Sequence, residues 1–246
     1  GASRLGVAPG EIAEWRAAAE SMAVPYDDVL DVHLQDEDFA RREPWDFTTT
    51  PADRYPLLLN YPYFELYRRQ VIKQPDVVLA MHLQGHAFTP EQKRRNFAFY
   101  EPRTARDSSL SPGTNAVIAA EVGHLDLARA YLEEATLMDL HDLARNTTDG
   151  LHLAALAGGW LATVAGFGGL RDDAGRLQFA PRLPAAYGAL RFRVRYRGRR
   201  LQVTITDDAT RYEVLDGPPL RVEHHGEAVT VATEQPVRCA IPSPPS

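Results

Sequence analysis

The hydrophobic period of the chain changes near Gly166, and this change limits the folds open to it. Upstream, apolar residues recur at helical spacing, as in residues 125–138. Downstream, residues 190–197 alternate apolar side chains with arginines, the period of a half-exposed strand. Roughly six helical segments precede about seven short strands, an order that favours two separately packed units over a parallel α/β sheet. We therefore expect a helical portion over residues 1–169 and a β domain over 170–246.

Local signals predict where the helices begin and end. Residues 9–22 have amphipathic helical spacing. Thr89 followed by a proline and by Gln92 is typical of a capping box, and the helix that it opens should run to Tyr100. Ser111 should cap the next helix, with a proline at its first position. Gly123 can end that helix in a left-handed turn.

Two further helical segments contain unusual residues. Residues 63–84 are predicted to be one helix, with a break or kink near Lys73 and Gln74 because Pro75 removes a backbone hydrogen bond. Such a break would aim those two side chains away from the core. His152 should open a later helix whose small residues, 154–159, permit close contact with a neighbouring helix.

Composition argues against several classes of protein. A formal charge of −6 disfavours a nucleic-acid binder, and no run is apolar enough to span a membrane. The start of the chain shows no secretory signal, and Cys239, the only cysteine, cannot form an internal disulfide. These features fit a cytoplasmic protein. His224 and His225 are expected to be solvated rather than metal ligands, the arginine stripe to be a solvated sheet face, and residues 236–246 to be frayed.

The stretch 100–112 concentrates charge and hydroxyl groups directly before a helix N-terminus. Free backbone N–H groups and the helix dipole suit such a place to an anion, and Arg103 or Arg106 could add a bidentate contact. Composition alone favours a simpler interpretation, in which a polar loop pairs its own charges. Glu101 could likewise be a structural ion-pair partner.

Five ordered motifs resemble glycoside hydrolase family 65, which holds maltose, trehalose and kojibiose phosphorylases and some hydrolases. The resemblance runs from about Asp31 to about Val231 and is specific because several motifs occur in order at plausible spacing. The motifs are Val71-Ile72-Lys73-Gln74, Tyr100-Glu101-Pro102, Arg106-Asp107-Ser108-Ser109-Leu110-Ser111, Ala119-Ala120-Glu121-Val122-Gly123-His124 and Asp149-Gly150-Leu151-His152.

The resemblance implies a fold and a chemistry. The fold would be the second half of an (α/α)6 barrel, followed by a small C-terminal antiparallel β-sandwich domain. The reaction would be inverting cleavage of an α-glucoside by phosphate, which gives β-glucose 1-phosphate without a metal or organic cofactor. The Lys73–Gln74 pair would hold the glucosyl unit. Ser108, Ser109 and His152 would bind the phosphate, and Glu101 would be the candidate base if the protein were a hydrolase.

One expected element is missing from the sequence. The family's general acid lies in a Gly-Pro-Asp-Glu-Tyr motif upstream of Lys-Gln, and the nearest run here, residues 36–39, has the wrong context. We therefore expect a fragment, or one chain of a split enzyme whose partner brings the acid and the first half of the barrel. Exposed apolar faces should then cause association with that partner or between copies. A third interpretation is a non-catalytic carbohydrate-binding or interaction protein.

Overall fold

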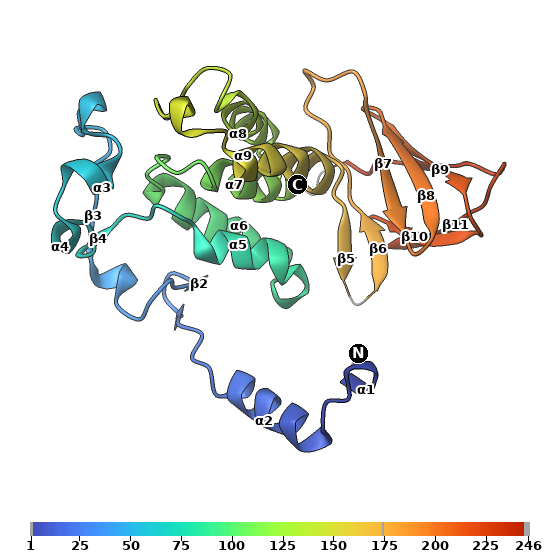
Figure 1. The fold of residues 1–246 in the computed structure, drawn as a ribbon, viewed down its shortest axis with the longest axis horizontal. Helices are drawn as coiled ribbons and strands as arrows, with labels where there is room; N and C mark the ends of the chain where they lie inside the picture. The colour runs from blue at the N-terminus through green and yellow to red at the C-terminus, as the bar shows by residue number, and fades with distance from the viewer. Residues whose placement is uncertain (1, 174, 244–246) are drawn as a thin grey trace.

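Helices predominate in the first two thirds of the chain, with four strands of two residues each among them, and longer strands occupy the last third (Figure 1). The computed structural model describes residues 2–173 and 175–243. The helices are α1 (Ala2–Leu5), α2 (Pro9–Glu20), α3 (Leu57–Asn60), α4 (Tyr63–Leu66), α5 (Asp76–Leu83), α6 (Pro90–Tyr100), α7 (Ser111–Glu121), α8 (Leu125–Leu137) and α9 (Leu153–Leu161). A π-helical turn over Ala162–Phe167 extends α9, and short 3-10 turns lie at Phe39–Arg41, Ala52–Arg54, Gly85–Ala87, Glu101–Arg103 and Thr147–Asp149.

Several predicted helix ends are confirmed. Thr89 forms the complete capping box with Gln92, and α6 ends at Tyr100 as expected. Gly123 follows α7 with a φ of 95°, a left-handed conformation that glycine adopts without strain. The amphipathic segment near the N-terminus is helix α2, but it buries none of its side chains and lies apart from α5–α9 in Figure 1.

Two predictions, one about residues 63–84 and one about the cap of α7, are wrong. Residues 63–84 are not one kinked helix, because the chain between α4 and α5 is extended and includes strand β4 (Arg69–Gln70). That segment pairs with other extended chain instead: β4 with β3 (Glu43–Pro44), and Ile72 with Thr104. Ser111 is not the cap of α7. Leu110 occupies that position, and the Ser111 hydroxyl donates to the Lys73 carbonyl at 2.7 Å.

Helices α7 and α9 pack closely and run in the same direction. A Cβ added to Gly113 would lie 2.6 Å from the Gly158 Cα, so the backbones touch where the start of α7 meets the middle of α9. Farther along, a Cβ added to Gly166 would lie 3.4 Å from the Val117 Cα. The predicted close contact of the small residues around 154–159 is therefore confirmed, and it places the N-termini of both helices at one end.

Helix α5 runs alongside α7 in the same sense. At their starts, the Ser111 hydroxyl reaches the Lys73 carbonyl. At their ends, Lys93 lies against both helices: its Nζ is 2.6 Å from Glu121 Oε1, and a Cβ added to Gly85 would lie 3.2 Å from the same Nζ. Helices α5, α7 and α9 therefore have their N-termini at one end, while α6 and α8 are the return helices between them.

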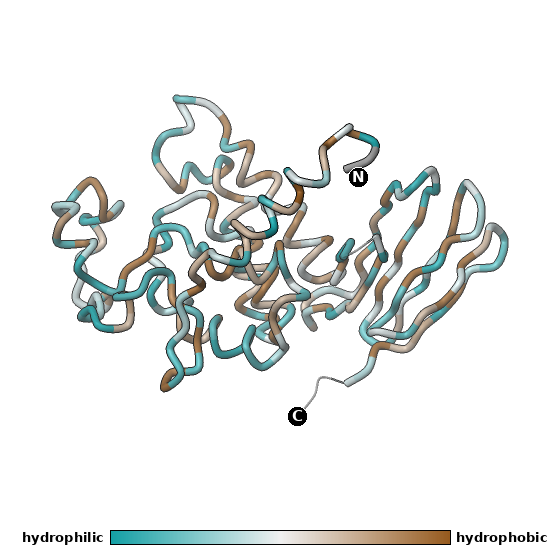
Figure 2. Tube along the Cα trace, turned by 90° about the horizontal axis from the view of Figure 1, so that it is seen from below, coloured by the Kyte–Doolittle hydropathy of each residue, from teal (hydrophilic) through white to brown (hydrophobic). Residues whose placement is uncertain are grey.

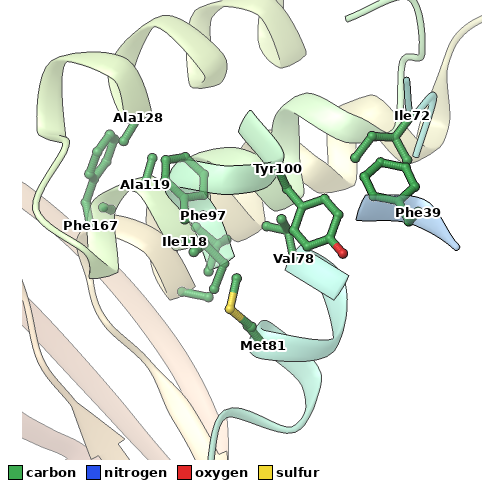
Figure 3. Close-up of a cluster of buried hydrophobic side chains, with 13 residues drawn as sticks. Phe39, Ile72, Val78, Met81, Phe97, Tyr100, Ile118, Ala119, Ala128 and Phe167 are labelled. Carbon is green, nitrogen blue, oxygen red and sulfur yellow. The ribbon is translucent and has the colours of Figure 1, made fainter. Parts of the chain in front are cut away.

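The largest hydrophobic cluster among these helices joins α5, α6, α7 and the π-helical turn (Figure 3), and a smaller cluster of Ala116, Tyr131 and Ala162 joins α7 to α8 and to the same turn. The largest fully buried side chains of the first cluster include Phe97 and Tyr100 of α6, Met81 of α5 and Ile118 of α7. The Tyr100 hydroxyl donates to the His33 carbonyl at 2.7 Å, which satisfies the one polar atom that this side chain brings into the core.

The strands form two small sheets in addition to the pairs β1–β2 (Tyr26–Asp27 and Val32–His33) and β3–β4. One sheet has the order β11-β10-β6-β5 and the other β12-β9-β8-β7. The strands are β5 (Arg171–Asp173), β6 (Arg176–Phe179), β7 (Leu190–Tyr196), β8 (Arg199–Ile205), β9 (Ala209–Asp216), β10 (Leu220–His224), β11 (Glu227–Val231) and β12 (Val237–Ala240). Both sheets contribute to one apolar cluster, and Figure 2 shows hydrophilic and hydrophobic positions intermixed along the strands.

The β portion differs from expectation in three places. Strands β6 and β10 pair in parallel, whereas the other pairs in the two sheets are antiparallel as predicted. Residues 237–240, predicted to be frayed, form β12 on the edge of β9; residues 244–246 lie outside the described residues. His224 is buried rather than solvated, because it continues the inward-facing side of β10, and it contacts the Tyr212 hydroxyl at 2.7 Å. Arg191, Arg193 and Arg195 are exposed, as expected of a solvated face.

Within the described part of the chain, no helix is both long and apolar enough to cross a bilayer.

Candidate functional site

The loop between α6 and α7 is held in place by Arg106. This residue has a φ of 53°, a left-handed conformation uncommon for a residue other than glycine. Its Nη2 lies 2.8 Å from Glu101 Oε1 and 2.9 Å from the Tyr131 hydroxyl, and its guanidinium stacks 4.5 Å from the centre of the Tyr131 ring. The Tyr131 hydroxyl in turn donates to Glu101 at 2.9 Å. Arg106 therefore connects the loop to Glu101 and to Tyr131 of α8, although its side chain is 44% exposed.

The next residues connect the loop to the segments around it. Asp107 Oδ2 accepts the backbone N–H of Leu57 at 2.8 Å, while Asp107 Oδ1 is buried without a hydrogen-bond partner. Ser108 is buried and its hydroxyl accepts the backbone N–H of Leu110 at 3.3 Å, whereas Ser109 is half-buried. Both serines stand directly before α7, as the sequence predicted.

Lys73 and Gln74 lie in a bend that leads through Pro75 into α5, rather than at a kink within a helix. The segment is bound to the serine loop on both sides of Ile72: its N–H donates to the Arg103 carbonyl at 2.9 Å, and its carbonyl accepts the Ala105 N–H at 2.8 Å. Both side chains are exposed and line a cleft of about 610 Å³. Polar side chains on the wall of that cleft are Gln35, Asp36, Arg42, Arg69, Asp76 and Asp107.

His152 is the residue before α9, and Asp139 holds it there. The ring Nδ1 is 2.6 Å from Asp139 Oδ1, and the backbone N–H of His152 donates to Asp139 Oδ2 at 2.9 Å. Hydrogen bonds from the His152 ring and N–H keep the pKa of Asp139 below its usual value. Because α7 and α9 begin at the same end, His152 and the serine loop share that end of the helices.

The structure therefore brings Lys73, Gln74, Ser108, Ser109 and His152 to one end of three neighbouring helices. Glu101 has one carboxylate oxygen, Oε1, in contact with Arg106 and Tyr131, as the ion-pair interpretation predicted, and its side chain is 23% exposed.

Sequence reasoning missed Tyr131, Glu134 and Asp139, which lie on α8 and in the turn after it. Burial raises the pKa of the Glu134 carboxyl, while Arg106 opposes that effect. Tyr131 and Glu134 are three residues apart, a spacing that puts them on one side of α8, but Asp139 lies beyond the helix and had no such signal. Among the described residues, no group of three or more His, Cys, Asp and Glu side chains could hold a metal ion.

Comparison with known proteins gives a consistent family. The glycosyl hydrolase family 65 central catalytic domain matches residues 1–161, and the C-terminal domain of that family matches residues 170–231. An uncharacterized glycosyl hydrolase of Mycobacterium leprae is 52% identical over 98% of this chain and 30% of its own length. The α,α-trehalose phosphorylase of Thermoanaerobacter brockii is 40% identical over 93% of this chain, and the maltose phosphorylase of Bacillus subtilis is 35% identical over 92%; each is covered over 30% of its length.

The fold comparison agrees. A solved structure from the human microbiome, described as a kojibiose phosphorylase, matches 97% of this chain and 32% of its own with a TM-score of 0.85 and 27% identity. The chain thus spans about a third of the relatives that it matches. The family resemblance of the five motifs is confirmed, and the chain belongs to glycosyl hydrolase family 65.

Proposed function

We propose that this chain supplies the phosphate-binding and glucosyl-binding groups of an inverting α-glucoside phosphorylase. Such an enzyme converts a disaccharide and phosphate into β-glucose 1-phosphate and a free sugar. The observation that carries the proposal is that Lys73–Gln74, the two loop serines and His152 precede α5, α7 and α9, three neighbouring helices that begin at the same end. Relatives named as trehalose, maltose and kojibiose phosphorylases support the choice of reaction.

The chemistry of this end suits inorganic phosphate. At these helix starts Pro112 has no N–H, and the N–H groups of Ser111, Leu153 and Ala155 donate to the carbonyls of Ser108, Leu151 and His152. Gly113 and Ala154 retain N–H groups for a ligand, at the positive ends of the two helix dipoles. Two hydroxyl groups, Ser108 and Ser109, add neutral donors, and His152 adds an imidazole that can carry a positive charge. Phosphate arrives already ionised, so it needs donors that hold it and no base that activates it.

The proposed reaction needs one group that these residues do not contain. Phosphate oxygen would attack the anomeric carbon from the face opposite the leaving sugar, and the glycosidic bond would break as an acid protonates the leaving oxygen. The sequence holds no Gly-Pro-Asp-Glu-Tyr motif. We propose that the acid belongs to a further family 65 segment, in the same polypeptide or in a partner chain.

Exposed apolar side chains support the same idea. Leu153 is 73% exposed and Trp160 56% exposed on α9, and Leu83 is 61% exposed on α5. If only solvent covered α5 and α9, large apolar side chains this exposed on both helices would be unusual. We propose that residues 1–169 are part of an (α/α)6 barrel whose remaining helices cover α5 and α9, and that residues 170–246 are its C-terminal domain.

Phosphate binding by the chain tests the proposal. We expect inorganic phosphate to shift the amide resonances of residues 108–114 and 152–155 in NMR spectra. In the double variant Ser108→Ala/Ser109→Ala the affinity should fall about tenfold, because two hydroxyl donors are lost. Ser21→Ala is the matched control, since Ser21 is an exposed helix-end serine whose hydroxyl donates to Ala18. Shifts confined to the arginine face of β7, or no effect of the double variant, would contradict the proposed site.

A further inference from the structure

We infer that Asp139 is the positioning residue that orients the His152 ring toward the anion and keeps its charge available. This inference rests on the proposed function, because it assumes that His152 contacts phosphate. Asp139 lies in the turn after α8, and its carboxylate contacts the same residue twice, at the ring and at the backbone. The side chain of Asp139 is 9% exposed and that of His152 18% exposed, so the pair is largely shielded from water.

The two contacts leave the ring little freedom. An ionised carboxylate can only accept, so the nitrogen that faces it, Nδ1, carries a hydrogen. The second carboxylate oxygen accepts the backbone N–H of His152, which fixes the start of α9 relative to the ring. Nε2 has no hydrogen-bond partner among the described residues. It is therefore the ring atom left for a ligand, in the way that carboxylates fix the free nitrogen of histidines in other sites.

The charge of Asp139 matters as much as its position. When an anion binds at Nε2, that nitrogen must carry a hydrogen to donate, so the ring takes a second proton and becomes positively charged. Asp139 balances this charge at Nδ1, 2.6 Å away. A charge-assisted hydrogen bond to phosphate is about twice as strong as a neutral one. Phosphate binding should therefore be coupled to uptake of a proton from solution.

The same helix supports the serine loop, which strengthens the inference. Tyr131, two turns before Asp139, holds Arg106 and Glu101, and Arg106 sets the left-handed turn that leads to Ser108. Tyr131 in the middle of α8 and Asp139 in the turn after it thus hold the two parts of the proposed phosphate site, the serine loop and His152. Asp139 holds His152 in position through hydrogen bonds, as Tyr131 holds the loop through Arg106 and Glu101.

The substitution Asp139→Asn distinguishes the contact with the His152 ring from the contact with the His152 backbone N–H. The amide oxygen of asparagine can still accept the backbone N–H of His152. Its NH2 group, however, must face Nδ1 as a donor, so the neutral ring is driven to carry its hydrogen on Nε2 instead. Phosphate affinity should fall about tenfold because the charge-assisted bond becomes a neutral one. Asp142→Asn is the matched control, because Asp142 caps Thr147 in the same turn and is bonded to no imidazole.

The test uses the 246-residue chain with ¹⁵N-labelled histidine. At a pH where the ring is neutral, NMR of the wild type should show the hydrogen on Nδ1, and Asp139→Asn should move it to Nε2 while Asp142→Asn leaves it in place. Calorimetry in two buffers of different ionisation enthalpy should show proton uptake with inorganic phosphate for the wild type and less for Asp139→Asn.

The outcomes can be told apart. A wild-type ring with its hydrogen on Nε2, or a folded Asp139→Asn protein that binds phosphate as tightly as the wild type and takes up as many protons, would overturn the positioning role. The expected tautomers without any phosphate binding by the wild type would confirm the Asp139–His152 orientation and overturn the proposed function instead.

Discussion

The contact between Gly113 of α7 and Gly158 of α9 gives the sharpest prediction, because the two glycines are unequally crowded. A Cβ at residue 113 would lie 2.6 Å from the Gly158 Cα, whereas a Cβ at residue 158 would lie 3.3 Å from the Gly113 Cα. Ordinary contacts of this kind begin at 3.4 Å. Gly113→Ala must therefore push two backbones apart by most of an ångström, while Gly158→Ala needs a shift of only about a tenth.

The free energies follow from these distances. Overpacking a tight contact costs roughly 1–3 kcal/mol, and a clash with backbone lies at the upper end because no side chain can rotate away. Alanine is favoured over glycine within a helix by about 1 kcal/mol. Gly113→Ala should thus lower the free energy of unfolding by about 2 kcal/mol, and Gly158→Ala should change it by less than about 1 kcal/mol. For a chain of this size, the first value corresponds to a Tm lower by about 4–8 °C.

Urea and thermal unfolding of the two variants provide the measurement. Gly10→Ala is the control for helix propensity alone, because nothing lies within 4 Å of a Cβ at that position, and it should not destabilise the protein. Gly113→Ala should also weaken phosphate binding, since it moves the start of α7 away from α9. The account of helix packing would be refuted by a Gly113→Ala protein as stable as the wild type, or by a larger effect at Gly158.

Three further predictions concern stability and association. Burial, assisted by the positive charge of Arg171, lowers the pKa of His82 to about 4. Between about pH 6.5 and pH 4 the unfolded state therefore binds a proton on this ring that the folded state does not bind. The free energy of unfolding should therefore fall as the pH is lowered from 6.5 to 4, and this residue should account for about 1–2 kcal/mol of the loss at pH 5. Urea unfolding of His82→Gln should lack that contribution. Glu121→Gln should lower the free energy of unfolding by about 3 kcal/mol, because the buried Lys93 loses its carboxylate. Trp160→Ser should reduce self-association in light scattering without lowering Tm, because the side chain is 56% exposed on an uncovered face.

For each of these three predictions, a control or a specific outcome would contradict the reasoning. An unchanged pH dependence in His82→Gln would show that this ring is not the group excluded from protonation. Glu91→Gln removes an exposed pair with Arg94 and should cost less than about 1 kcal/mol, so an equal loss at both glutamates would contradict the burial argument. Trp160→Ser protein that associates as strongly as the wild type would show that α9 is not the associating surface.

Signals that depend on neighbouring residues in the chain predicted the structure well. The capping box at Thr89 and the left-handed glycine at residue 123 were confirmed, because each acts within a few residues. The small-residue face of α9 was also confirmed, because small side chains permit close packing whichever helix lies against them. The failures arose where distant chain decides the conformation. Lys73 lies outside a helix because the residues before it pair with other chain: Ile72 pairs with Thr104, about 30 residues later, and helical spacing cannot report that pairing.

The same reason explains the other differences. The predicted cap at Ser111 fails because its hydroxyl finds the Lys73 carbonyl, a partner remote in sequence. The strand at 237–240 forms because the edge of β9 is available, although its own composition suggested a frayed end. Motif order led to the prediction that the serines and His152 bind phosphate, but it could not point to Asp139, because a supporting carboxylate has no fixed spacing from the residue that it contacts.

The central claim is that this chain serves phosphorolysis. The most direct measurement is ³¹P NMR of the enzyme isolated from its native source with this chain in it, supplied with α-linked glucose disaccharides with and without inorganic phosphate. The account predicts a signal of β-glucose 1-phosphate that appears only with phosphate and is lost in Ser108→Ala/Ser109→Ala enzyme. Release of free glucose at an equal rate without phosphate, or formation of the α-anomer, would contradict it.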